Sequence, residues 1–230
     1  DTFENFRGSC SFHVPKDVSK VISNNSQKLN VLHLNARSIV NKMDDLCSLI
    51  SETAIMWHAI AVSESWISQS IQSNFNIPGY QAFHCCRPAG TGGGSAIYAA
   101  SQLSPCQLHN PPFTTAEVVC VQIKSKNQRI VICQIYRPSS SDKHQFITEL
   151  EQCLIWLHKM NTTALITGDF NFDLFSLHTN SSVHSFLTST LSYGFLPTIS
   201  RMTRCVHPSS TLIDNILCND LSRAAHSGII

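Results

Sequence analysis

Leu165-Ile-Thr-Gly-Asp-Phe-Asn-Phe-Asp173 is the stretch that decides how this chain folds and what it does. Its apolar start predicts a buried strand, which we expect to stop at Gly168. A strand that ends in a glycine turn delivers Asp169 and Asn171 to the rim of a sheet, where a ligand can reach them. Aspartate accepts a proton from water or holds a hard cation, and an amide donates to phosphate oxygens. The stretch therefore suits metal-assisted phosphodiester cleavage, although Gly-Asp-x-Asn is equally common as turn chemistry.

Composition sets the limits around this stretch. With 230 residues, of which 43% are hydrophobic, the chain can bury one large core or two small ones, and it shows no repeat or linker, so we expect one domain. A formal net charge of +1 excludes a polybasic surface. Any contact with nucleic acid must therefore come from a local patch or a metal ion.

The ten cysteines predict free thiols. Only Cys85 and Cys86 are close neighbours, there is no Cys-x-x-Cys, and others lie in the apolar runs 118–121 and 130–133. Buried thiols behave as small hydrophobic groups, so we expect a reducing intracellular compartment, no disulfide and no zinc. The chain shows no signal sequence and no apolar run of membrane-spanning length, so no membrane partner is expected.

The hydrophobic pattern predicts alternating strands and helices after a poorly ordered extension at residues 1–28. The expected strands are 29–35, 60–66, 79–85, 92–100, 116–124, 129–136, 163–167 and 211–217, and the expected helices are 39–53, 144–158 and 181–193. The polar stretch 124–128 predicts a hairpin turn between two of the central strands, and we expect the central strands to be mostly antiparallel. The pattern favours an α/β fold in which two packed sheets are flanked by helices.

Polar side chains lie at the predicted strand ends or inside a strand: Asn35, Glu64, Tyr136, Asp169, Asn171 and Asp214. Most have a simpler explanation when taken singly: Asn35 could cap a helix, and Glu64 could be a solvated loop charge. A carboxylate inside the apolar run 212–216, however, needs a partner to offset its desolvation.

Six motifs, taken in order, give a resemblance to a known family: Leu-Asn-Ala-Arg-Ser (34–38), Ser-Glu-Ser-Trp (63–66), Gly-Gly-Gly (92–94), Ile-Tyr-Arg-Pro (135–138), Gly-Asp-Phe-Asn (168–171) and Leu-Ile-Asp-Asn-Ile (212–216). Over residues 29–230 the chain resembles the endonuclease/exonuclease/phosphatase superfamily. It is most similar to the apurinic-type endonuclease domain of LINE (non-LTR) retrotransposon polyproteins. The resemblance implies a DNase I-like four-layer α/β sandwich.

The resemblance also implies roles for the strand-end residues. Glu64 matches the ligand of a divalent metal, Mg²⁺ with Mn²⁺ as an alternative, and Asn35 matches the amide that helps to hold metal or phosphate. Asp169 matches the carboxylate that activates or orients the attacking water, and Asn171 matches the residue that fixes it and touches the phosphate. Tyr136 matches the tyrosine that supports the phosphate or the leaving oxygen.

Further matches concern the phosphate and the end of the chain. Thr203, Arg37 and Arg137 match positions that contact phosphate or DNA. Asp214 matches the aspartate that orients the histidine of a closing Ser-Asp-His motif. His226 comes too early to be that histidine, so we expect the domain at 29–230 to be truncated at its C-terminal side.

The function implied is that of a Mg²⁺-dependent endonuclease domain that nicks target DNA for reverse transcription. The expected partners are double-stranded DNA, the reverse transcriptase region of the same polyprotein and the element RNA; we expect a monomer that acts in the nucleus. Two alternatives remain open: a phosphatase of the same superfamily, and a catalytically impaired remnant that still binds DNA.

Overall fold

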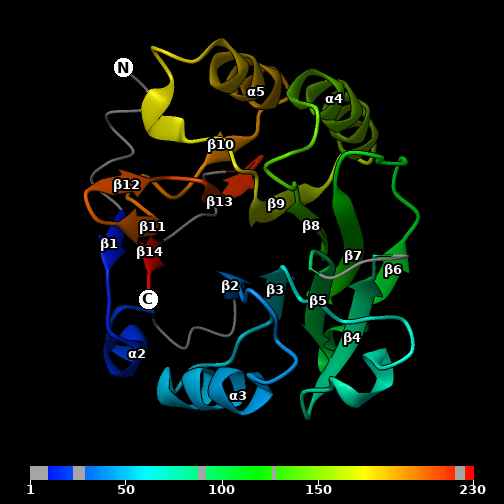
Figure 1. Ribbon diagram of the computed structural model, residues 1–230. Coiled ribbons are helices and arrows are strands. Elements are labelled where there is room, and N and C mark those ends of the chain that lie inside the picture. Colours follow the sequence, from blue (N-terminus) through cyan, green and yellow to red (C-terminus); the bar gives the residue numbers. More distant parts are fainter. Residues whose placement is uncertain (1–9, 23–28, 88–91, 126–127, 221–225) are drawn as a thin grey trace.

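Two β-sheets packed face to face form the centre of the molecule (Figure 1). The computed structural model describes residues 10–22, 29–87, 92–125, 128–220 and 226–230. The larger sheet has the order β10 (Leu196–Pro197), β13 (Asp214–Cys218), β9 (Thr163–Asp169), β8 (Gln128–Tyr136), β7 (Glu117–Ser125) and β6 (Cys106–Leu108). The smaller sheet has the order β2 (Val31–Asn35), β3 (Ala59–Ser63), β5 (Ser95–Ala100) and β4 (Tyr80–Cys85).

Helices cover the outer face of each sheet, which gives the expected four layers (Figure 1). Helices α4 (Lys143–Lys159) and α5 (Ser181–Ser192) pack on the larger sheet, and α3 (Met43–Glu52) packs on the smaller one. Helix α4 begins after Asp142, whose carboxylate accepts a hydrogen bond from the backbone N–H of Gln145 at 2.7 Å. This is the favoured way to cap a helix start. The predicted fold class is confirmed.

Strand β8 shows why the centre of the sheet reads as a nearly continuous apolar run. Ile130 and Ile132 point to the other sheet, whereas Val131 and Cys133 point to the helices. Successive side chains of a strand face opposite sides, so a strand covered on both faces must be apolar at almost every position.

The strand directions bring several strand ends to one rim. β8 and β9 are parallel, and β13 is antiparallel to β9, so the last residues of β8 and β9 lie beside the first residue of β13. In the smaller sheet β2 and β3 are parallel and end together at Asn35 and Ser63. The sequence motifs at these ends are thereby placed next to one another.

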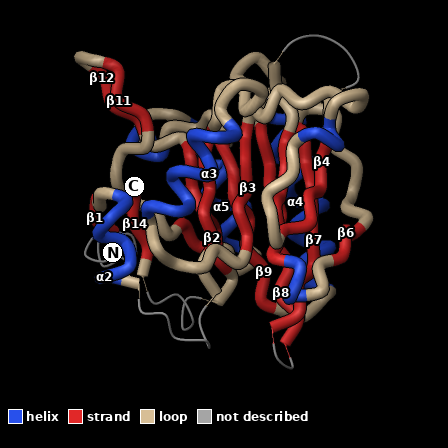
Figure 2. The backbone as a smooth tube through the Cα atoms, turned by 90° about the horizontal axis from the view of Figure 1, so that it is seen from below, coloured by secondary structure: helices blue, strands red, loops and turns tan. Residues whose placement is uncertain are grey.

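Several predicted strand boundaries at this rim are corrected. The strand expected at 60–66 ends at Ser63, and the strand expected at 92–100 begins at Ser95. β9 does not stop at Gly168 but continues to Asp169, because both residues still pair with β8. β13 begins at Asp214, so this carboxylate starts the strand and does not lie inside it. Thr211 belongs to a separate hairpin of β11 (Arg204–Val206) and β12 (Ser209–Thr211), which projects from the body of the molecule (Figure 2).

Residues 10–22 also differ from the expected poorly ordered extension. They form β1 (Cys10–Phe12), η1 (Pro15–Asp17) and α2 (Val18–Val21). β1 pairs in parallel with β14 (Ser227–Ile229), a partner more than two hundred residues away that local pattern cannot reveal. The rest of the predicted extension, residues 1–9 and 23–28, lies outside the described residues.

The remaining described elements are short 3₁₀ turns: η2 (Gln72–Asn74), η3 (Ser101–Leu103) and η4 (Leu174–Ser176). Among the described residues, the helices lack the combination of length and apolar character that crossing a membrane requires.

Candidate active site

Asn35 joins the two sheets at the rim. Its amide nitrogen donates to Oε1 of Glu64 at 2.8 Å and to Oδ2 of Asp169, also at 2.8 Å. The two carboxylate oxygens therefore cannot be further apart than twice that distance. Glu64 and Asp169 therefore converge at the rim, although they are about a hundred residues apart in sequence.

The backbone around this point is strained. Glu64, Trp66 and Asn171 have φ values of 53°, 57° and 50°, in the left-handed region that side chains rarely occupy. Arg37, two residues after Asn35, has a φ of 42°. Such conformations persist only where the surrounding structure holds them, and they cluster at functional sites.

Asp169 is buried and its two oxygens are directed separately. Oδ1 accepts from the backbone N–H of Asn171 at 2.9 Å, while Oδ2 faces Asn35. Burial raises the pKa of Asp169, although its hydrogen bonds oppose that shift. A carboxylate with a raised pKa is a better proton acceptor near neutral pH.

A polar network lies beneath Asp169, between the sheets. The hydroxyl of Ser63 accepts from the backbone N–H of Asp169 at 3.2 Å and from the amide of Gln134 at 2.6 Å. Its own proton is then free for Nε2 of His33, 3.1 Å away, which must be unprotonated to accept it. Desolvation lowers the pKa of His33 to about 3, which agrees with a neutral ring. Thr167 completes the chain by donating to Gln134 at 2.6 Å.

Tyr136 and Asp214 lie on either side of Asp169 as its partners in the neighbouring strands. Burial raises the pKa of Tyr136 to about 12, and the charges of Glu64 and Asp169 add to the effect. Burial raises the pKa of Asp214 to about 7, and the charge of Asp169 is the second cause of this shift. Oδ1 of Asp214 is buried and has no hydrogen-bond partner among the described residues.

Thr203 and Arg37 lie beside this group. The hydroxyl of Thr203 accepts from the backbone N–H of Asp214 at 3.2 Å, so it anchors the start of β13. The backbone N–H of Arg37 donates to Oδ1 of Asn35 at 3.0 Å, and the Arg37 side chain is exposed. Arg37 therefore remains available for a phosphate.

The expected phosphate contact of Arg137 is corrected. Its side chain is fully buried, and its guanidinium donates to the backbone oxygens of Phe170 at 2.7 Å and Asn171 at 3.0 Å. It also lies 4.5 Å from the centre of the Phe172 ring. Arg137 anchors the 169–171 loop, because its guanidinium donates hydrogen bonds to backbone carbonyls of the loop that would otherwise be unpaired.

The donor set at the rim fits a hard divalent cation. Glu64, Asp169 and Asn35 supply oxygen and amide groups, the ligand chemistry that Mg²⁺ prefers. Among the described residues no group of three or more His, Cys, Asp or Glu side chains could hold a metal ion. A cation with Glu64 as its main protein ligand would therefore take its other ligands from phosphate oxygens and water, as Mg²⁺ commonly does.

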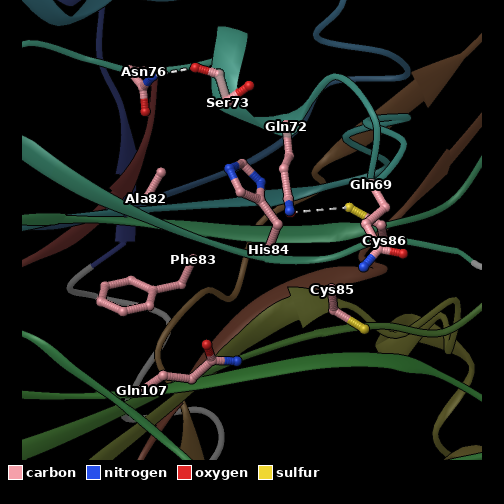
Figure 3. A pocket seen from close by; sticks show the side chains of 10 residues that line it. All are labelled: Gln69, Gln72, Ser73, Asn76, Ala82, Phe83, His84, Cys85, Cys86 and Gln107. Carbon is pink, nitrogen blue, oxygen red and sulfur yellow. Dashed lines mark hydrogen bonds between the residues drawn. The ribbon is translucent and has the colours of Figure 1, made fainter.

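A pocket of about 650 Å³ lies along β4 (Figure 3). It is lined mainly by amide, thiol and small side chains: Gln69, Gln72, Ser73, Asn76, Ala82, Phe83, His84, Cys85, Cys86 and Gln107. The residues that line it include no Asp, Glu, Lys or Arg.

Sequence reasoning missed Ser63, Gln134 and His33. Ser63 belongs to the motif at 63–66 and His33 to the expected strand 29–35, but neither was assigned a role. Gln134 interrupts an apolar run. A buried polar residue in such a run needs a partner, and this was the available signal.

A family model described as the endonuclease/exonuclease/phosphatase family matches residues 29–229. Among curated protein sequences, none matches this chain.

Three solved structures share the fold at low sequence identity. The endonuclease domain of TRAS1, a telomere-specific non-LTR retrotransposon, has a TM-score of 0.65 at 12% identity, covering 84% of this chain and 85% of that one. An AP endonuclease from Archaeoglobus fulgidus has a TM-score of 0.61 at 16% identity, with coverages of 83% and 86%. The 3′ phosphatase NExo from Neisseria, bound to a product DNA hairpin, has a TM-score of 0.59 at 15% identity, with coverages of 86% and 89%. With a family model matching nearly the whole chain, this protein belongs to the endonuclease/exonuclease/phosphatase family.

Proposed function

We propose that this chain is a Mg²⁺-dependent DNA endonuclease domain that nicks target DNA for a LINE-type retrotransposon. Members of its family are typically metal-dependent hydrolases, including nucleases and phosphatases. The observation that carries the proposal is the convergence of Glu64 and Asp169 on the amide of Asn35. The proposal of DNA as substrate rests on the amino-acid sequences of the motifs at 34–38 and 135–138. The likeness to the TRAS1 endonuclease domain supports it.

Asp169 is suited to receive the proton of the attacking water. As the water oxygen bonds to phosphorus, the bond from phosphorus to the deoxyribose oxygen breaks. That oxygen takes up a proton from solvent water, and Asp169 later returns its proton to solvent. The N–H of Asn171 and the amide of Asn35 keep the Asp169 carboxylate in one orientation. A divalent cation bound by Glu64 beside Asn35 would supply positive charge for the phosphate oxygens.

Tyr136 and Asn171 are suited to hold the phosphate. With its pKa raised to about 12, Tyr136 keeps its proton at neutral pH and can donate it in a hydrogen bond. The side-chain amide of Asn171 uses one N–H on the backbone oxygen of Arg137 at 2.8 Å, which leaves a second N–H for a phosphate oxygen. The Asn171 amide is held in place before substrate arrives, and a donor oriented in advance lowers the barrier for developing charge.

The proposal extends to partners that such a domain would serve. These are double-stranded DNA, the reverse transcriptase region of the same polyprotein and the element RNA, with the domain acting as a monomer in the nucleus.

A nicking assay tests the proposed function. Supercoiled plasmid should be converted to the open circular form in Mg²⁺ and not in EDTA. Asp169→Asn should lower the rate by about 10²–10⁴-fold, the usual contribution of general base catalysis. DNA binding with no nicking in Mg²⁺ or Mn²⁺ would instead identify an impaired remnant.

A phosphatase is the second candidate, favoured by the likeness to the 3′ phosphatase NExo. Release of phosphate from a 3′-phosphorylated duplex or from inositol phosphates, measured beside plasmid nicking, separates the two. Faster phosphate release than nicking at equal enzyme concentration would reject the endonuclease in favour of the phosphatase.

A further inference from the structure

One row of polar residues crosses the larger sheet at the rim. Glu117 of β7 pairs with Tyr136 of β8, which pairs with Asp169 of β9, which pairs with Asp214 of β13. The site described above uses the last three. Glu117 is the fourth member, on the side of Tyr136 that faces away from Asp169.

Glu117 is paired with a cation, Arg87, that lies two residues after the end of β4. Its Oε1 accepts from Nε of Arg87 at 2.8 Å and lies 2.7 Å from Nη2 of the same guanidinium. The Glu117 side chain is only 15% exposed, and its Oε2 is buried without a hydrogen-bond partner among the described residues. The strand is also tied to the smaller sheet, because the hydroxyl of Ser95 donates to the backbone oxygen of Glu117 at 2.9 Å. Glu117 therefore holds Arg87 in a defined place.

Gly93 makes room for the guanidinium. A methyl group at this position would overlap Nη2 of Arg87 and lie 2.5 Å from its Cζ. The Arg87 side chain remains 31% exposed. Glu117 is the one acceptor that its guanidinium contacts within the part of the chain that the structure describes, so further N–H groups can still bind a ligand.

Arg87 lies within electrostatic reach of the phosphate-binding tyrosine. Burial is the main cause of the raised pKa of Tyr136; Glu117 adds to that shift and Arg87 opposes it. The rim also presents the carboxylates of Glu64 and Asp169, which repel a polyanion. A cation next to Tyr136 offsets this repulsion on the β7 side.

We propose that Arg87, held by Glu117 and seated on Gly93, binds a DNA phosphate that neighbours the cleaved one on the Tyr136 side. The inference rests on the proposed function, because it names a second contact for the same DNA substrate. The planar guanidinium suits this role, since it can pair with a carboxylate on one edge and a phosphate on another.

Equilibrium binding to a short fluorescent duplex, in EDTA so that the DNA stays intact, tests this subsite. Arg87→Ala should weaken binding about tenfold, a typical loss for a charge-assisted hydrogen bond. It should also reduce the slope of log Kd against log salt by about one. Arg87→Lys keeps the charge and should recover part of the affinity. Arg129→Ala, at the opposite end of β8, is the matched control and should leave both values unchanged.

A second pair of variants tests the contact between Gly93 and the Arg87 guanidinium. Gly93→Ala should displace the guanidinium and weaken binding as Arg87→Ala does, and the double variant should lose no more than either single one. Gly79→Ala carries similar strain at φ 83° with no atom within 4 Å, so it controls for the backbone. All variants are compared at an unchanged thermal unfolding midpoint.

The outcomes separate this proposal from the proposed function. If the unaltered chain binds the duplex and Arg87→Ala binds with the same affinity and salt slope, Arg87 and Glu117 form only a structural ion pair, and the proposal fails. If the unaltered chain does not bind DNA, the proposed function itself is rejected, and the subsite with it.

Discussion

Asp169 and Asp214 are direct partners across β9 and β13, one at the end of its strand and the other at the start. Two carboxylates so placed disfavour each other's ionisation. Asp214 shows the consequence, because burial and the charge of Asp169 raise its pKa to about 7. Because of this pairing, the stability of the folded chain depends on whether Asp214 is protonated.

Asp214 and His33 should oppose each other in the pH dependence of stability. The pKa of Asp214 rises from 3.8 to about 7 on folding, so the folded state binds more protons and stability falls as pH rises through this range. The pKa of His33 falls from 6.5 to about 3, so the unfolded state binds more protons and stability rises with pH in that window. Between about pH 4 and 6.5 the two slopes nearly cancel.

Single substitutions should reveal each slope. The reference is the double variant Asp214→Asn/His33→Gln. Relative to it, the free energy of unfolding of Asp214→Asn, in which His33 still titrates, should rise by about 2–3 kcal/mol between pH 4.5 and 6.5. That of His33→Gln, in which Asp214 still titrates, should fall by a similar amount. Urea unfolding in EDTA at several pH values measures both. Equal pH profiles for the two single variants would contradict the assigned burial of these groups.

Mg²⁺ should stabilise the protein through Glu64. A cation at about ten times its Kd adds about 1.4 kcal/mol to the free energy of unfolding if it binds the folded state alone. Thermal unfolding in Mg²⁺ and in EDTA should show this difference for the unaltered chain and little of it for Glu64→Gln. Glu52→Gln removes an exposed carboxylate at the end of α3 and should keep the full effect. An undiminished Mg²⁺ effect in Glu64→Gln would place the cation elsewhere.

The sequence predicted those parts of the fold that local pattern determines. Helix α4 was expected at 144–158 and spans Lys143–Lys159, because Phe146, Leu150 and Leu157 repeat on one face. Strand β1 was missed, since its stability comes from pairing with β14 and not from its own residues. Local propensity gives no information on such a partner.

At the candidate active site, too, the sequence pattern predicts some contacts and not others. Glu64 and Asp169 could be expected to meet because each lies at a strand end on one rim. The burial of Arg137 could not be expected, because it depends on how the 169–171 loop folds over the guanidinium. The pairing of Arg87 with Glu117 joins the segment after β4 to β7 across thirty residues and has no local signature.

Arg137 should contribute mainly to stability. Arg137→Ala leaves the carbonyls of Phe170 and Asn171 without their donors and should cost about 3–5 kcal/mol of unfolding free energy, in the range for breaking a buried charged network. Arg129→Ala, at an exposed position, should change stability by less than about 0.5 kcal/mol. Urea unfolding compares the two. Normal stability combined with weakened DNA binding in Arg137→Ala would restore its expected role as a phosphate contact.

Gly168 should tolerate no side chain, because β8 and β9 come too close there. Its register partner is Ile135, and a methyl group at Gly168 would overlap the backbone oxygen of Ile135 and lie 2.9 Å from its carbonyl carbon. Backbone atoms in a paired strand cannot move aside without breaking the ladder that positions Asp169. We expect Gly168→Ala to cost about 3 kcal/mol or more, or to prevent folding. Gly194→Ala is the control: its φ is 80° but no atom lies within 4 Å, so it should cost only about 1 kcal/mol. If urea unfolding finds the two variants equally stable, the close approach of β8 to β9 is wrong, and with it the placement of Asp169 at the rim.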